Sequence, residues 1–131
     1  MDYVNICNEY FRAFSDKNLD RLSEMFHDDV YLRDWEILAN GKEEVLDANK
    51  NIFDSVDKIE VITENQGLEF NGINDTTDVF NEIEIHINDG EERLVVVDII
   101  EIELKSGLIK SVRAFKGWVD QKQFFVIWMA H

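Results

Sequence analysis

The chain has 131 residues, of which 45% are hydrophobic, and its 28 acidic and 13 basic residues give a formal net charge of −15. That length fits one domain with a single core and room for one internal cavity. The charge repels phosphate backbones and anionic membrane surfaces, which argues against nucleic-acid and membrane partners. The N-terminal residues lack the basic region and apolar core of a signal peptide, and no run reaches transmembrane length, so we expect a cytoplasmic protein.

Three helices are expected in the first half of the chain. Apolar side chains at three- and four-residue steps predict the first over about residues 2–15. Asn18 can cap a second helix, whose apolar stripe ends at Phe26. The third follows the Asn40-Gly41 turn, and its stripe runs from Val45 to Val56 and includes Asn49.

Strand patterns follow the second helix and dominate after the third. A first strand is predicted over residues 30–36. Beyond the third helix the apolar period changes to two, which is typical of strands. The further strands are predicted at residues 58–63, 79–87, 93–104, 108–115 and 124–129. Three helices with a mainly antiparallel sheet define an α+β fold.

Two acidic residues interrupt the apolar faces of these strands. Asp34 shares a face with Val30 and Leu32 if residues 30–36 form a strand, because side chains alternate with a period of two. Asp98 lies among aliphatic residues on one face of the strand at 93–104. A carboxylate on the core side of a sheet is costly unless it is paired, so both acids are candidate functional residues.

No metal or cofactor site is expected. His27, His86 and His131 show no metal-ligand spacing with one another, and Cys7 is the only cysteine. The chain also lacks a glycine-rich phosphate loop of the dinucleotide or P-loop type.

The element order and the ungapped stretch from Tyr10 to Asp34 resemble the nuclear transport factor 2-like superfamily, which includes ketosteroid isomerases and SnoaL-like polyketide cyclases. The resemblance covers nearly the whole chain and implies a single domain over residues 1–131. It implies a cone in which the three helices pack on a curved sheet that encloses a hydrophobic pocket for a small apolar molecule. It also implies a homodimer, because members commonly pair through their sheets.

In ketosteroid isomerases the matching tyrosine donates a hydrogen bond to the carbonyl oxygen of the substrate, and the matching aspartate shuttles the proton. The resemblance therefore implies Tyr10 as the oxyanion donor and Asp34 as the base. Both residue types suit proton abstraction next to a carbonyl, which needs a carboxylate and a hydrogen-bond donor. Asp98 is the candidate for a protonated acid that donates a second hydrogen bond. Counting back from the Ser106-Gly107 turn would instead place Ile100 at the acid position.

Trp35 occupies a position where proline usually follows the isomerase base, so a bulky side chain at the mouth of the pocket would change the accepted substrate shape. The residues expected to line the pocket are Phe14, Leu32, Trp35, Phe53, Ile100 and Trp118.

Each catalytic candidate also has a structural interpretation. Asp34 can be a strand-end acid that pairs with an arginine or a loop amide, Tyr10 a core aromatic, and Asp98 a buried acid bonded to Tyr10 or Trp118. Three functions therefore stay open. They are an isomerase or cyclase acting on a small apolar carbonyl compound, a module that binds a small ligand without chemistry, and, less favoured, a protein-interaction scaffold.

Overall fold

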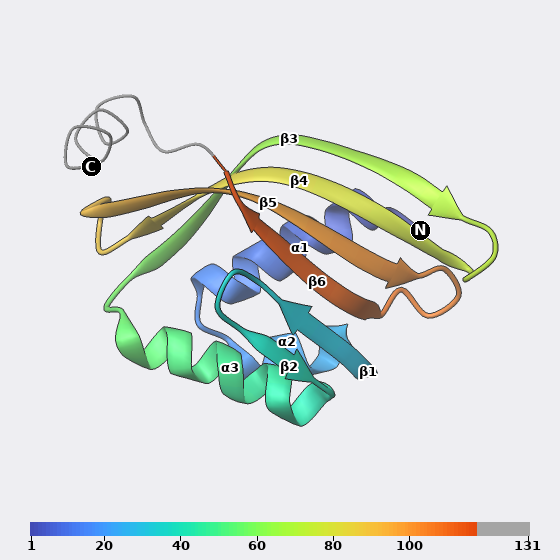
Figure 1. The fold of residues 1–131 in the computed structure, drawn as a ribbon, viewed down its shortest axis with the longest axis horizontal. Coiled ribbons are helices and arrows are strands. Elements are labelled where there is room, and N and C mark those ends of the chain that lie inside the picture. Colours follow the sequence, from blue (N-terminus) through green and yellow to red (C-terminus); the bar gives the residue numbers. More distant parts are fainter. Residues whose placement is uncertain (118–131) are drawn as a thin grey trace.

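The computed structural model describes residues 1–117. This part of the chain forms three helices and one six-stranded sheet (Figure 1), which confirms the expected α+β class. The helices are α1 (Tyr3–Ser15), α2 (Leu19–Met25) and α3 (Lys42–Ser55). The strands are β1 (Phe26–Arg33), β2 (Leu38–Asn40), β3 (Ile59–Asn71), β4 (Thr76–Ile87), β5 (Glu92–Glu103) and β6 (Ile109–Lys116).

The sheet has the order β2-β1-β6-β5-β4-β3. All neighbouring strands are antiparallel except β1 and β6, which are parallel. The long strands β3, β4 and β5 curve over α1. The helices α2 and α3 lie on the same side of the sheet as α1, near β1 and β2 (Figure 1). The core therefore lies between the helices and the concave face of the sheet.

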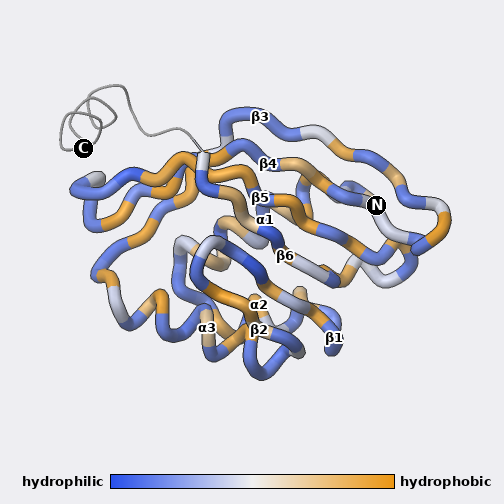
Figure 2. Tube along the Cα trace, in the orientation of Figure 1, coloured by the Kyte–Doolittle hydropathy of each residue, from blue (hydrophilic) through white to orange (hydrophobic). Residues whose placement is uncertain are grey.

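Side chains alternate between the two faces of the sheet, as their period of two requires. Figure 2 shows hydrophobic and hydrophilic residues in alternation along the long strands. On β5, Val96, Asp98, Ile100 and Ile102 are all buried against the helix side, as expected from the sequence. Asp98 lies opposite Asn81 of β4 and Ala114 of β6, so it occupies the middle of the inner face.

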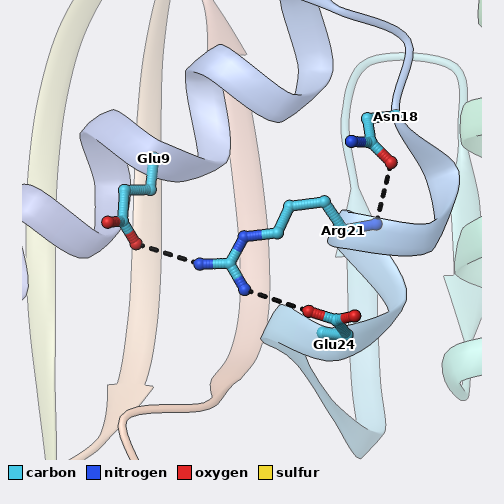
Figure 3. Close-up of polar contacts among 4 residues, drawn as sticks. All are labelled: Glu9, Asn18, Arg21 and Glu24. Carbon is cyan, nitrogen blue, oxygen red and sulfur yellow. Dashed lines mark hydrogen bonds and ion pairs between the residues drawn. The ribbon is translucent and has the colours of Figure 1, made fainter.

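The first two helices begin at side-chain caps and are tied together by one arginine. The side chain of Asn18 accepts a hydrogen bond from the main-chain amide of Arg21, which confirms its capping role. The guanidinium of Arg21 then bonds Glu9 of α1 at 3.1 Å and Glu24 of α2 at 3.3 Å (Figure 3). Because the Arg21 side chain is 42% exposed, we assign these ion pairs less than about 1 kcal/mol each.

Some strand boundaries differ from the sequence expectations. β1 begins at Phe26 and ends at Arg33, so Asp34 lies in the following turn and not on the strand. β2 has three residues, too few to give a pattern. β3 continues to Asn71 although most of its second half is exposed, because pairing with β4 along its whole length holds it in the sheet. The strand expected at residues 124–129 lies outside the described residues.

Candidate functional site

A cavity of about 320 Å³ opens between the helices and the inner face of the sheet. This volume lies at the lower end of the range for small-molecule sites. Much of its wall is apolar and includes Phe14, Leu32, Ile37, Ile52, Leu94 and Val112. Tyr10, Asp34 and Asp98 also line it, so the structure brings the three catalytic candidates to one cavity. Asp34 and Trp35 also line an adjoining pocket of about 560 Å³, which is lined by neither Tyr10 nor Asp98.

The turn after β1 holds the carboxylate of Asp34 in place. Oδ1 accepts a hydrogen bond from the main-chain amide of Glu36 at 2.7 Å and a second from the amide of Ile37. The amide of Asp34 in turn donates to the carbonyl of Ile37. These bonds form because a short acidic side chain readily accepts from amides two and three residues ahead. Within residues 1–117, Oδ2 makes no hydrogen bond, so the turn fixes one oxygen of this cavity-lining carboxylate and leaves the other without a partner among these residues.

Asp98 is the most deeply placed acid of the cavity. It is 8% exposed, because β4 and β6 flank its strand on both sides. Burial, and then the negative charge of Asp34, raise the pKa of Asp98 from 3.8 to about 7. A substantial fraction of this carboxyl is therefore protonated near neutral pH and can donate a hydrogen bond. Its main-chain oxygen accepts from the side-chain amide of Asn81 at 3.2 Å, which anchors β5 at this point.

Tyr10 reaches the cavity from α1 and is 4% exposed. Its ring packs against Phe11, Phe14 and Phe26, with centroid distances of 5.5, 6.4 and 6.0 Å. Burial, and then the charge of Asp98, raise the pKa of the hydroxyl well above its ordinary value, so it stays a donor. The hydroxyl has no hydrogen-bond partner within residues 1–117, which leaves it for a molecule in the cavity.

The SnoaL-like domain matches residues 7–112 of the chain. The chain belongs to the SnoaL-like domain family. This match, together with the neighbours below, confirms the resemblance to the nuclear transport factor 2-like superfamily. No curated protein matches this SnoaL-like chain in sequence.

Solved structures with the same fold have names that refer to different functions. A candidate dehydratase of the NTF2-like family from Streptomyces avermitilis is 16% identical, with a TM-score of 0.76 over 87% of this chain and 92% of that one. Hexachlorocyclohexane dehydrochlorinase LinA-type3 from Novosphingobium barchaimii LL02 is 16% identical, with a TM-score of 0.72 over 86% and 82%. Nuclear transport factor 2 from Cryptosporidium parvum is 13% identical, with a TM-score of 0.73 over 86% and 90%. At these identities the likeness shows the fold alone.

Five of the six expected pocket residues of this SnoaL-like domain lie within the described residues, and they divide into two groups. Phe14, Leu32 and Trp35 line the cavity. Phe53 does not line it but lies behind Phe14, with their rings edge to face at 5.1 Å. Ile100 is fully buried elsewhere on the inner face of β5, so of these two residues only Asp98 lines the cavity. Trp118 lies outside the described residues.

Four polar residues that line the cavity were not among the site residues expected from the sequence. Asn49 of α3 is 1% exposed, and its place in an apolar helical stripe was the signal that could have identified it. Glu36, Glu92 and Lys116 are exposed residues of three different segments that meet at the cavity, so no local pattern could reveal them. The ammonium of Lys116 lies 5.5 Å from the centre of the Trp35 ring, within range of a cation–π interaction.

Residues 1–117 contain no group of three or more His, Cys, Asp or Glu side chains placed to hold a metal ion. Across the same residues, no helix has the length and apolar character needed to cross a membrane.

Proposed function

We propose that this SnoaL-like domain binds a small, largely apolar carbonyl compound and transfers a proton on it. The observation that carries this proposal is the convergence of Tyr10, Asp34 and Asp98 on one cavity with largely apolar walls. Proton abstraction next to a carbonyl needs a base near the C–H bond and donors near the oxygen. Two acids and a phenol in one small cavity provide both.

Asp34 is the base in this proposal, because Oδ1 is fixed by the turn while Oδ2 is available. The carboxylate takes the proton from the carbon next to the carbonyl, and the C–H electron pair moves into the enolate. The hydroxyl of Tyr10 and the protonated carboxyl of Asp98 donate to the enolate oxygen, where negative charge develops. In a substrate whose enolate is conjugated with a further double bond, return of the proton to the far carbon completes an isomerisation. In a substrate with a second carbonyl, the enolate carbon attacks that carbonyl carbon, and the proton held by Asp34 passes to the resulting alkoxide oxygen to complete a cyclisation.

The names of two structural neighbours are consistent with this chemistry. Removal of hydrogen chloride by a dehydrochlorinase, or of water by a dehydratase, also requires loss of a proton to a base. The low identities give no substrate for this chain, so the argument depends on the geometry of its own cavity.

The test compares turnover of the wild type, Asp34→Asn and the control Asp29→Asn. A carbonyl substrate is first selected by following exchange of its acidic hydrogens for deuterium in the presence of the protein. Asp34→Asn keeps an oxygen that can accept from the turn amides but lacks a base, so we expect about a 100-fold or greater loss of rate. Asp29 is exposed on β1, so its variant should retain full activity. Unchanged turnover in Asp34→Asn would overturn the assignment.

The alternative is a module that holds a small ligand in the same cavity without reaction. The bonds from Asp34 to the turn amides support it, since they give that carboxylate a structural role. Mass spectrometry of the protein purified under native conditions would then detect a bound small molecule. In this case neither the wild type nor Asp34→Asn would exchange the acidic hydrogens of a carbonyl compound for deuterium.

We also propose that the domain forms a homodimer through the outer face of its sheet. Phe80 and Phe115 are 39% and 52% exposed, and the outward residues Val97 and Ile99 lie beside them in neighbouring strands. Burial of this apolar group against a second copy would stabilise association. Sedimentation should show a dimer at micromolar concentration that Phe80→Glu weakens and Ile73→Glu, in the β3–β4 turn, does not. A wild-type monomer would overturn the proposal.

A further inference from the structure

Asn49 is a polar residue on an otherwise apolar face of α3. It is 1% exposed, and the other buried residues of this helix are Val45 and Phe53. The side chain lines the cavity together with Ile52 of the same helix. A buried amide costs free energy unless its polar atoms are hydrogen-bonded, so its partners must be accounted for.

Only part of the hydrogen-bonding capacity of Asn49 is used within residues 1–117. Nδ2 donates to the carbonyl oxygen of Val45 at 2.8 Å. Because a carbonyl can only accept, this bond fixes which end of the amide is nitrogen and leaves Oδ1 on the other side. Within residues 1–117, Oδ1 accepts no hydrogen bond. The structure thus leaves an acceptor, and one further N–H, on a residue of the cavity wall.

Asn49 lies on a different element from the groups assigned to proton transfer. Tyr10 comes from α1, Asp34 from the turn after β1 and Asp98 from β5, whereas Asn49 comes from α3. α3 packs against β1, β2 and α2. A ligand whose carbonyl lies at the acids would therefore have a second polar contact on another wall, with apolar residues such as Leu32 and Ile52 nearby.

We propose that Asn49 determines specificity by accepting a hydrogen bond from a hydroxyl group of the ligand, so that the site selects a hydroxylated carbonyl compound over its unsubstituted parent. This inference rests on the proposed function for the position of the carbonyl end. A hydroxyl fits because it can donate to Oδ1 and also accept from the second N–H of Nδ2. It is neutral, so it costs less to bury against this apolar wall than an ammonium group.

Binding of indanone and of its ring-hydroxylated derivatives tests the inference. Titration calorimetry would compare the wild type with Asn49→Leu, which replaces the amide with an apolar group of similar size. Asn51→Leu is the matched control, because Asn51 is an exposed residue of the same helix. We expect at least one hydroxylated derivative to bind the wild type about 10- to 100-fold more tightly than indanone. Asn49→Leu should abolish this preference and still bind indanone, while Asn51→Leu should retain it.

Three results would overturn the inference. The wild type could bind indanone as tightly as every hydroxylated derivative, Asn49→Leu could keep the preference, or the wild type could bind none of these probes. Thermal denaturation first checks that each variant is folded. If Asn49→Leu does not fold, Asn49→Ala replaces it with the same expectation, because it removes the amide without adding bulk.

The test of the role of Asn49 can be distinguished from the test of the proposed proton transfer. Asp34→Asn removes the base but leaves Asn49 in place, so it should keep the hydroxyl preference while losing turnover. Unchanged turnover in Asp34→Asn with the preference intact would overturn proton transfer and leave the role of Asn49 standing. Loss of turnover in Asp34→Asn, with the preference intact in Asn49→Leu, would overturn the role of Asn49 alone.

Discussion

Asp34 and Asp98 line the same cavity and are electrostatically linked, because the charge of Asp34 adds to the larger effect of burial in raising the pKa of Asp98 to about 7. The two carboxyl groups differ in their surroundings. Asp34 is half-buried and accepts hydrogen bonds from turn amides, whereas the Asp98 carboxyl has no hydrogen-bond partner within residues 1–117. Burial of Asp98 therefore favours its protonated form near neutral pH, as the acid of such a site requires.

Removing the charge of Asp34 should lower the pKa of Asp98. In Asp34→Asn the repulsion disappears while burial stays, so the pKa should fall but remain above its ordinary value. Carbon NMR titration of the Asp98 carboxyl measures it directly. Asp29→Asn, on the exposed side of β1, should leave the pKa of Asp98 unchanged. A pKa that stays the same or rises in Asp34→Asn would show that the two groups are not linked.

Ionisation of Asp98 should destabilise the folded protein as the pH rises. The pKa of Asp98 is higher in the folded state than its ordinary value of 3.8, so between about pH 4 and pH 7 the folded state holds more protons than the unfolded state. The free energy of unfolding therefore decreases with pH across this window. The total decrease in the free energy of unfolding is about 4 kcal/mol at most. No decrease is expected at pH values below 3.8, the ordinary pKa of the carboxyl.

The variant Asp98→Asn cannot ionise, so it should lack this decrease. Urea denaturation at about pH 4 and about pH 8 should show its stability relative to the wild type improving with pH. The relative stability of the surface variant Asp29→Asn should not show this trend. A constant difference between Asp98→Asn and the wild type would contradict a raised pKa for Asp98.

Tyr10→Phe should separate ligand recognition from folding. The ring of Tyr10 packs against three phenylalanines, but its hydroxyl has no partner within residues 1–117. We therefore expect a change of less than about 1 kcal/mol in the free energy of unfolding, with a loss of about 10-fold or more in turnover of a carbonyl substrate. A large loss of stability would instead indicate that the hydroxyl is bonded within the fold.

Lys17 should contribute to stability by capping the end of α3 from a distant turn. Its ammonium donates to the carbonyl of Phe53 at 2.8 Å and to that of Val56, at the end of the helix where the backbone leaves acceptors unpaired. Lys17→Met keeps the apolar stem but loses the donors, so we expect a loss of about 1 kcal/mol, measured by urea denaturation. Lys105→Met, on the surface, should have a smaller effect. Equal effects of the two variants would contradict a capping role.

The three helices and most of the strands could be predicted because each has a buried face that repeats along the sequence, whereas β2 is too short to show one. The inward position of Asp98 follows from the period of two on β5, which the structure confirms. The end of β1 could not be predicted in this way, because the side chain of Asp34 itself forms the turn that stops the strand. The length of β3 depends on pairing with β4, since most of its exposed second half carries no apolar pattern.

The polar residues of the cavity could be predicted only where a family resemblance or an interrupted apolar pattern indicated them. Tyr10 and Asp34 were implied by the resemblance of the stretch that joins them to the ketosteroid isomerases, and Asp98 was indicated by its aliphatic neighbours. Asn49 interrupts the stripe of α3 in the same way and could have been included. Glu92 and Lys116 lie at strand ends that approach the cavity only because the sheet curves, and that curvature has no local signature.

The parallel pairing of β1 with β6 has a consequence for how the protein folds during synthesis. β6 lies between β1 and β5 in the sheet but follows both of them in the chain. Until β6 has left the ribosome, β1 and β5 each have an unpaired edge, and such edges are prone to aggregation. The last wall of the cavity, with Val112 and Ala114, also forms only at that stage. A ligand could therefore stabilise only chains that have already been translated through β6.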